Sequence, residues 1–197
     1  MPERPLVGKK KGVEKYPYLL TLQTLQKVSI MQSLQSTVTT IPQAILPNTP
    51  KDLRVALAMG ETLGINRPVL EIQKDLYRKV PDSYYQFKSK GNTQIIYLSW
   101  ELLSCCMDYI TPGWEKSISL NQIGERVTVE CCVTIHSSDG SFKRTATGSD
   151  TLLDEGYGGP VVDAESQAFR RALANFGFCS YLWDKDISNA LIKRLKG

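Results

Sequence analysis

Apolar residues alternate with polar ones most strictly between residues 127 and 136, where Val, Cys and Ile side chains take every second position. This period of two predicts a strand with one buried face. Asp139-Gly140 predicts a hairpin turn into a partner strand at 141–148, and residues 114–120 are predicted to form the strand before them. We therefore expect a three-stranded antiparallel meander.

Helical spacing of apolar residues flanks this meander, at 50–63, 68–79, 100–109, 161–178 and 186–196. Thr49 is expected to cap the first of these helices and Gly64 to end it. In the longest helix, we expect Asp163 and Glu165 in the first turn and Gly177 at the end. The expected fold class is α+β: an antiparallel meander packed on a long helix, with an N-terminal helical extension.

Three segments are expected along the chain. Residues 1–15 are basic and polar without periodicity, which indicates a flexible arm. Residues 16–80 are expected to form a partly helical extension, which Pro42 and Pro47 interrupt. Residues 81–197 contain the meander and the longest helix, and we expect them to form the core that carries the function.

The composition is that of a globular protein, with 42% hydrophobic and 22% charged residues. The formal net charge is only +4, but cations gather toward residues 1–50 and 161–197, while acids outnumber bases in 111–160. This distribution allows a polyanionic partner without demonstrating one.

The sequence indicates neither a membrane segment nor an oxidising compartment. No apolar run approaches the roughly 18 residues of a membrane span, and the stretch after Lys9 lacks a signal-peptide cleavage site. The five cysteines form two adjacent pairs plus Cys179, which suits neither a metal site nor a disulfide framework. We expect a cytoplasmic protein with buried thiols and no membrane partner.

The motifs of common enzyme classes are missing. His136 is the one histidine, which argues against a Ser-His-Asp set or a His-based metal site. No G-x-x-x-x-G-K-[ST] phosphate loop occurs, and the glycines at 156–159 precede a proline, which indicates a bend. We therefore expect no catalytic residue, no metal and no cofactor, and a role other than that of an enzyme.

Arg170 and Arg171 stand together on the polar side of the longest predicted helix, next to Gln167 and Asn175. Two guanidinium groups on a rigid helix suit backbone phosphates, because each planar fork can bind two oxygens. The alternative is a solvated helix face with local ion pairs.

Cations are interleaved with aromatic rings in residues 84–100, where Lys88 and Lys90 precede Tyr97 and Trp100. This combination is typical of single-strand binding, in which cations follow phosphates and rings stack on bases. The alternative is a loop whose aromatic side chains anchor it to the core. The meander carries four cations of a candidate secondary DNA site, Lys116, Arg126, Lys143 and Arg144, although interleaved acids favour a solvated face.

Four motifs follow one another in this part of the chain. Gly113–Ser117 opens the first strand, Asp139–Phe142 forms the turn, Ala164–Gly177 contains Arg-Arg-Ala-Leu before Phe-Gly, and Asp184–Asp186 follows. Together, over about residues 84–190, they resemble the annealing core of the Rad-fifty-two superfamily, which includes bacterial DdrA-like proteins and phage annealing proteins.

The resemblance implies an oligomeric ring that binds single-stranded DNA in a groove. It implies annealing of complementary strands without nucleotide hydrolysis, in homologous recombination and DNA repair. The implied partners are single-stranded DNA, further copies of the chain, and other recombination or single-strand-binding proteins, and the implied location is at the nucleoid.

Carried over by position, Arg170 and Arg171 look like the paired basic residues of the inner groove, and Tyr97 looks like their neighbour. The chain departs from the family at three positions expected to be basic: Phe87, Ser138 and Ala174. The inner groove is then expected to use Lys88 or Lys90, and the secondary site is weakened.

Two other classes of protein fit the same order of elements. A double-stranded RNA-binding module is disfavoured, because Asp163 and Glu165 stand where such modules place lysines. A protein-interaction scaffold remains an alternative, because a fold does not fix a function. A metal-dependent nuclease is disfavoured, because the carboxylates are scattered.

Overall fold

The computed structural model describes residues 45–152 and 159–196. The chain divides into two compact units, Met1–Thr40 and Ile41–Gly197, and every described residue belongs to the second. The expected arm, the first part of the expected extension and most of the glycine-rich bend lie outside the described residues. No helix in the described ranges is long and apolar enough to cross a membrane.

The predicted meander is confirmed as a three-stranded antiparallel sheet of β3 (Glu115–Ile123), β4 (Arg126–Ser137) and β5 (Gly140–Thr151), in the order β3-β4-β5. Its strands run further than predicted, because pairing continues to Ile123 with Arg126 and to Arg126 with Thr151. The alternation works as expected, since the apolar residues of β4 are at most 1% exposed: Val127, Val129, Cys131, Val133 and Ile135.

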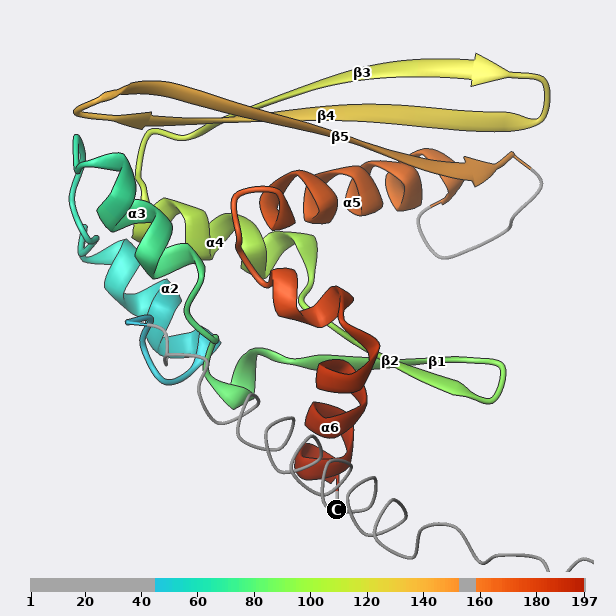
Figure 1. Cartoon of the computed structure of the whole chain (residues 1–197), viewed down its shortest axis with the longest axis horizontal. Coiled ribbons are helices and arrows are strands. Elements are labelled where there is room, and N and C mark those ends of the chain that lie inside the picture. Colours follow the sequence, from blue (N-terminus) through green and yellow to red (C-terminus); the bar gives the residue numbers. More distant parts are fainter. Residues whose placement is uncertain (1–44, 153–158, 197) are drawn as a thin grey trace, which may run out of the picture. The chain divides into compact units, whose positions relative to one another are not determined.

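Helix α5 (Gly159–Ala174) covers the apolar face of this sheet, beneath β5 and β4 (Figure 1). The contact is close at Gly148 of β5, where an added Cβ would lie 2.1 Å from the carbonyl oxygen of Ala164. Only glycine therefore lets this strand and this helix backbone approach so closely. The fold class is α+β, as predicted.

The ends of α5 differ from the prediction of 161–178. The helix begins at Gly159, so Asp163 and Glu165 lie beyond its first turn, and the expected stabilisation of acids by the helix dipole there is wrong. It stops at Ala174 rather than continuing to 178, and Gly177 has a φ of +101° in the chain reversal that follows.

Three further helices precede the sheet: α2 (Pro50–Ala58), α3 (Val69–Leu76) and α4 (Trp100–Ile110). The predicted cap of α2 is confirmed, since the Thr49 hydroxyl accepts from the amide of Asp52, and the Ser99 hydroxyl caps α4 in the same way by accepting from the amide of Leu102. The expectation that α2 continues to Gly64 is wrong, because the chain leaves the helix after Met59, with Gly60 at a φ of +77°. Buried side chains of all three helices join one core with α5 and the sheet.

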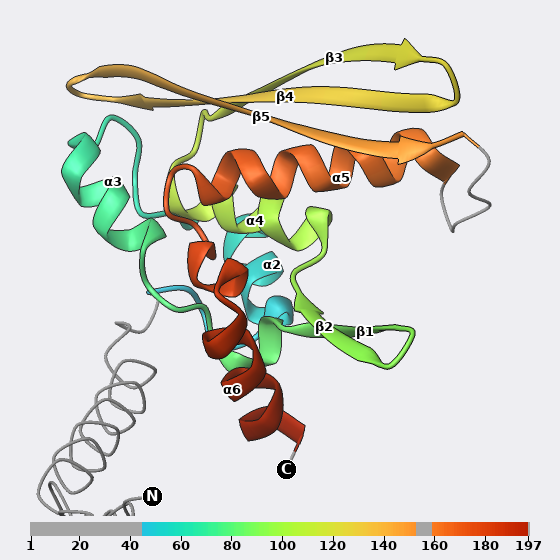
Figure 2. The same cartoon turned by 45° about the vertical axis from the view of Figure 1, so that its right-hand side comes forward.

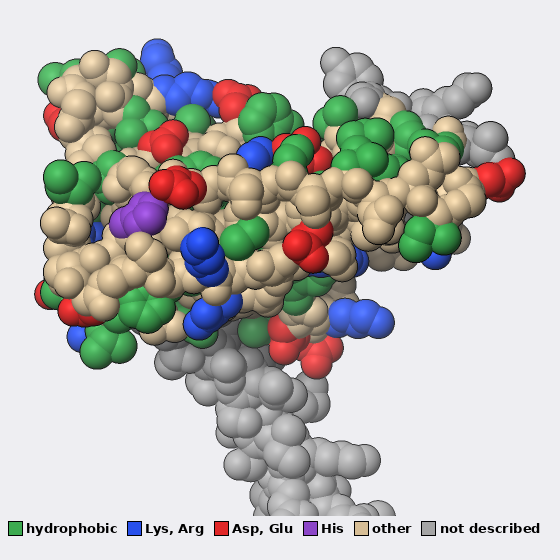
Figure 3. All heavy atoms as spheres, turned by 90° about the horizontal axis from the view of Figure 1, so that it is seen from above, with side chains coloured by type: hydrophobic (Ala, Val, Ile, Leu, Met, Phe, Trp, Pro, Cys, Tyr) green, Lys and Arg blue, Asp and Glu red, His purple; other side chains and the backbone are tan. Residues whose placement is uncertain are grey.

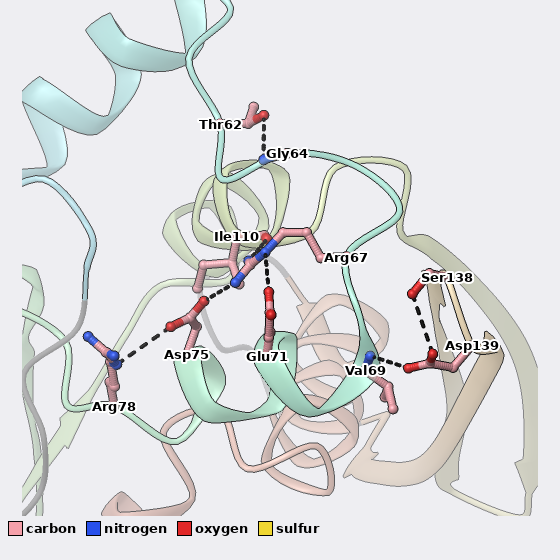
Figure 4. A network of polar contacts seen from close by, with 10 residues as sticks. All are labelled: Thr62, Gly64, Arg67, Val69, Glu71, Asp75, Arg78, Ile110, Ser138 and Asp139. Atoms are coloured by element: carbon pink, nitrogen blue, oxygen red, sulfur yellow. Dashed lines mark hydrogen bonds and ion pairs between the residues drawn. The ribbon is translucent and has the colours of Figure 1, made fainter.

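A polar network fixes α3 against its neighbours (Figure 4). The Arg67 guanidinium binds the buried carboxylate of Asp75 and donates to the carbonyl of Ile110 at 3.2 Å. The amide of Val69 donates to the Asp139 carboxylate at 2.8 Å, and this carboxylate lies in the turn between β4 and β5. The network thus joins α3 to α4 and to the sheet.

A second, two-stranded sheet was not predicted. It consists of β1 (Gln86–Lys90) and β2 (Thr93–Tyr97), joined by a turn at Gly91 with a φ of +57°. The alternative for residues 84–100 is therefore wrong in expecting a loop, but the anchoring of this segment to the core by aromatic side chains is confirmed for Tyr84 and Tyr85, which are 1% and 7% exposed. The remaining elements are the short helices η1 (Asp82–Tyr84) and η2 (Ser180–Trp183), and α6 (Lys185–Lys196), which begins one residue before its predicted start.

Candidate nucleic-acid interface

One side of α5 is left uncovered by the rest of the protein. Its buried residues face the sheet and α4. On the opposite side, the residues that follow Asp163 at helical spacing (i+4, i+7, i+8 and i+11) are, like Asp163 itself, exposed or half-buried. We call this side the open face of α5; it consists of Asp163, Gln167, Arg170, Arg171 and Ala174. Figures 1 and 2 both show α5 between the three-stranded sheet and the β1–β2 hairpin.

Arg170 points from the open face toward the hairpin. Its guanidinium carbon lies 5.4 Å from the centre of the Tyr97 ring on β2. The Nε atom is buried and has no hydrogen-bond partner among the described residues, which also place no carboxylate within ion-pair distance of Arg170. Burial lowers the pKa of Arg170, although Tyr97 and Asp163 oppose this. The site therefore holds a partly desolvated cation that has no carboxylate of the described residues at ion-pair distance.

The β1–β2 register decides which other residues share the side of Tyr97. Because paired residues point to the same face of a hairpin, Lys88 and its partner Ile95 lie on the same face as Tyr97 and its partner Gln86. The opposite face packs on α6, where the Lys196 ammonium lies 4.6 Å from the centre of the Phe87 ring. Phe87 is thus an anchor of the hairpin. Lys88 is exposed on the Tyr97 face.

Lys90, the other predicted cation of the hairpin, ends β1 opposite Thr93. Its side chain lies outside the described part of the protein. Of the predicted primary site, the structure thus brings Arg170 and Tyr97 into contact and puts Lys88 on the same hairpin face.

Arg171 points the other way, toward the outer edge of β5. It donates to the carbonyl of Thr147 at 2.7 Å, and its guanidinium carbon lies 5.8 Å from the centre of the Trp183 ring. Asn175 donates to the carbonyl of Thr145 at 3.2 Å. A shallow groove runs here, lined by Thr145, Ala146, Thr147, Arg171, Ala174, Asn175 and Trp183.

Sequence reasoning missed Trp183. It is the last residue of η2 and directly precedes the Asp184–Asp186 motif. A large aromatic residue next to a recognised motif was the available signal, but nothing in the sequence says that this ring is exposed beside Arg171.

The four cations of the predicted secondary site do not form one cluster. Lys116 and Arg144 lie on the helix side of the sheet, where Lys116 pairs with Glu165 at 2.8 Å and Arg144 lies over the Phe176 ring at 5.4 Å. Lys143 lies on the other face of the sheet, which is turned away from α5, and Arg126 is the first residue of β4, far along the strand from Lys143. Figure 3 views the sheet from above and shows cations and acids scattered among uncharged side chains.

No group of three or more His, Cys, Asp or Glu side chains among the described residues is arranged to hold a metal ion. Burial raises the pKa of the Cys131 thiol to about 11 and that of Cys179 to about 12. These cysteines are therefore protonated and unreactive at neutral pH.

Two kinds of comparison with known proteins were informative. No family model matches the chain, but individual DNA repair proteins do. It is 38% identical over 128 residues to the DNA repair RAD52-like protein 1, mitochondrial, of Arabidopsis thaliana, which covers 64% of this chain and 73% of the relative. It is 34% identical over 125 residues to the DNA repair RAD52-like protein 2, chloroplastic, of the same plant, covering 60% and 62%. Since the first relative is 38% identical and nearly three quarters of its length is covered, the chain belongs to the RAD52-like DNA repair proteins.

Proposed function

We propose that this protein binds single-stranded DNA along the open face of α5 and anneals complementary strands without nucleotide, as an oligomeric ring acting in recombination and repair. The DNA-binding residues of this proposal are Arg170, Arg171, Tyr97, Lys88 and Lys90. The resemblance of residues 164–177 to DdrA-like and phage annealing proteins supports it, as does the family of the chain.

The observation that carries the proposal is the state of Arg170. A half-buried guanidinium has lost hydration, and in return it has gained the Tyr97 ring and the more distant charge of Asp163, with no carboxylate of the described residues at ion-pair distance. A phosphate would supply the missing charge and accept from the terminal N–H groups of this guanidinium. Arg171 borders the same face of α5, and Lys88 shares the hairpin face of Tyr97; both would contact neighbouring phosphates.

The mechanism is physical. Neutralising phosphates releases counterions, so that affinity should fall steeply with salt. A strand held by its backbone keeps its base edges free, so a second strand can sample registers until a complementary match forms. A ring would raise the effective concentration of such sites.

Strand β3 supports the self-association in this proposal. Its side chains are all exposed, because α5 lies beneath β5 and β4. Ile118 and Leu120 share the apolar face of the sheet and are 51% and 56% exposed. A second copy of the chain would cover this stripe, whose exposure in a monomer is unfavourable.

The test is annealing of two complementary fluorescent oligonucleotides without nucleotide. Wild type is compared with Arg170→Ala/Arg171→Ala and with a control, Lys51→Ala/Lys74→Ala, that removes two exposed cations from α2 and α3. We expect the first variant to lose annealing while mass photometry still detects the oligomer, and the control to anneal normally. Equal affinity of the wild type for duplex and single strands would contradict the proposal and favour the RNA-binding or scaffold alternatives.

A further inference from the structure

The groove beside Arg171 has the composition of a small binding site, not of a structural crevice. Its walls are the edge of β5, with Thr145 and Thr147, and the end of α5, with Ala174 and the following residue Asn175. The ring of Trp183 stands at one side and remains 56% exposed. The Asn175 amide and the Arg171 guanidinium, which bind the carbonyls of Thr145 and Thr147, thus lie beside one large exposed aromatic ring.

The exposure of Trp183 is imposed by the backbone around it. Cys179 adopts a left-handed conformation with a φ of 54°, and η2 then turns Tyr181 inward. Tyr181 is 8% exposed; its hydroxyl lies 3.0 Å from that of Tyr85 and accepts from the amide of Val80 at 3.1 Å. With Tyr181 fixed in the core, the end of η2 holds Trp183 in a defined position at the surface.

Arg171, at the border of the open face of α5, lies beside this ring. One guanidinium N–H donates to Thr147, and the group lies against one side of the Trp183 ring. The remaining N–H groups can bind an anion, because a guanidinium offers five donors. A cation and a stacking ring are thus held together, one residue along α5 from Arg170.

We infer that Trp183 is a platform on which one unpaired nucleobase stacks, with the phosphate of that nucleotide contacting Arg171. The inference rests on the proposed function and identifies the part of the DNA that this groove would take. Stacking uses the face of a base and leaves its pairing edge free, which annealing requires. It is also tolerant of sequence, since every base has a π-face.

The occupant favoured here is a nucleotide, not a side chain of a second copy, because the Arg171 guanidinium, a group that binds phosphate, lies beside the ring. The apolar stripe suited to a second copy lies on β3, which is not among the lining residues of the groove. A ring buried between copies would instead be needed for assembly, and the test separates the two cases.

The experiment uses intrinsic fluorescence together with anisotropy of a labelled oligo-deoxythymidylate. The protein has three tryptophans: Trp183, the exposed Trp100, and Trp114, which stacks on Phe169. We expect DNA to quench the wild type and Trp100→Phe, but to quench Trp183→Phe much less. Trp183→Phe should keep most of the affinity, and Trp183→Ala should lose about 5- to 100-fold. A matched oligomer of abasic sites should bind the wild type and Trp183→Ala equally.

Quenching that persists in Trp183→Phe, or full affinity in Trp183→Ala, would overturn the inference while leaving the proposed function intact. Loss of the oligomer in Trp183→Ala would assign the ring to a contact between copies and would also overturn it. A wild type that binds no single-stranded DNA would refute the proposed function itself.

Discussion

Arg67 and Arg170 are both largely withdrawn from water, but their surroundings differ. The Arg67 side chain is 17% exposed and contacts the carboxylate of Asp75, itself 6% exposed, together with the carbonyl of Ile110. Arg170 contacts the ring of Tyr97, and its Nε has no partner among the described residues. One buried charge is neutralised within the protein and the other is not.

The difference separates a structural role from a binding role. A buried ion pair with satisfied hydrogen bonds is costly to break, because removing one partner leaves the other charge buried alone. A buried cation without an anion already carries a desolvation cost, so its removal should not harm the fold. Sites that trade stability for function in this way are typical of binding surfaces.

The largest effect is expected at Arg67. Arg67→Ala should lower the free energy of unfolding by about 3 kcal/mol, because the Asp75 carboxylate then keeps only the Nε of Arg78, 3.5 Å away. Urea denaturation followed by circular dichroism measures this. The double variant Arg67→Met/Asp75→Leu should recover most of the loss, since it buries no charge. A loss below about 1 kcal/mol in the single variant would mean that the pair is solvated.

The opposite result is expected at Arg170. Arg170→Met should leave the free energy of unfolding unchanged or raise it by up to about 1 kcal/mol, because an apolar side chain replaces a desolvated cation. Affinity for single-stranded DNA should fall about 10- to 100-fold, as expected for a lost charge-assisted hydrogen bond. Paired urea and anisotropy titrations test both, with Arg78→Met as the control for DNA binding. A destabilised variant with normal affinity would make Arg170 structural.

A smaller effect is expected at Tyr97, whose ring holds the Arg170 guanidinium. Tyr97→Leu should weaken DNA binding by about 2- to 5-fold, which corresponds to a cation–π contact of about 0.5–1 kcal/mol. Tyr97→Phe should bind like the wild type, because the observed contact is with the ring. Weak binding by Tyr97→Phe would assign the role to the hydroxyl instead.

The meander was predictable because the buried residues of its central strand, β4, recur with the same period of two as the apolar residues in the sequence. One residue in two along β4 is buried, so the apolar pattern and the sheet agree. The ends of α5 were not predictable to the same degree. Its apolar stripe continues past Ala174 to Phe176, which is buried in the turn after the helix, and periodicity alone does not distinguish a helical residue from one packed just beyond it.

The β1–β2 hairpin was missed because most of its side chains are polar and exposed; among the described side chains of its strands, only Ile96 is buried. The Gly91-Asn92 pair between two five-residue segments was a usable turn signal. Without the hairpin, Tyr97 could be placed near Arg170 only by resemblance.

The arginine pair illustrates the limit for the site. The sequence puts Arg170 and Arg171 side by side, but consecutive helix positions differ by about 100°, so the two guanidiniums reach opposite borders of the open face, toward Tyr97 and toward Thr147. The position of the Trp183 ring depends on the left-handed backbone of Cys179, and a cysteine in the sequence does not predict that conformation.

The smallest effect is expected where an ion pair is exposed, at Asp82. Partial burial alone would raise the pKa of Asp82, but hydrogen bonds from Lys79 and Arg194, both at 2.7 Å, outweigh this and lower it. A lowered folded-state pKa contributes stability above the unfolded value of about 4, and this contribution disappears as the pH falls through the folded-state pKa. Because the Asp82 side chain is 44% exposed, the contribution should stay below about 1 kcal/mol.

Urea unfolding of the wild type and Asp82→Asn at neutral and at acidic pH measures this contribution. The wild type should be slightly more stable at neutral pH, and the difference should vanish in acid, where Asp82 of the wild type is protonated and also uncharged. High salt should reduce the neutral-pH difference, since exposed charges are screened. A difference that is large, or that persists in acid, would mean that Asp82 behaves like the buried partner of Arg67. The solvent exposure of the acidic residue would then no longer separate the weak ion pairs of this protein from the strong ones.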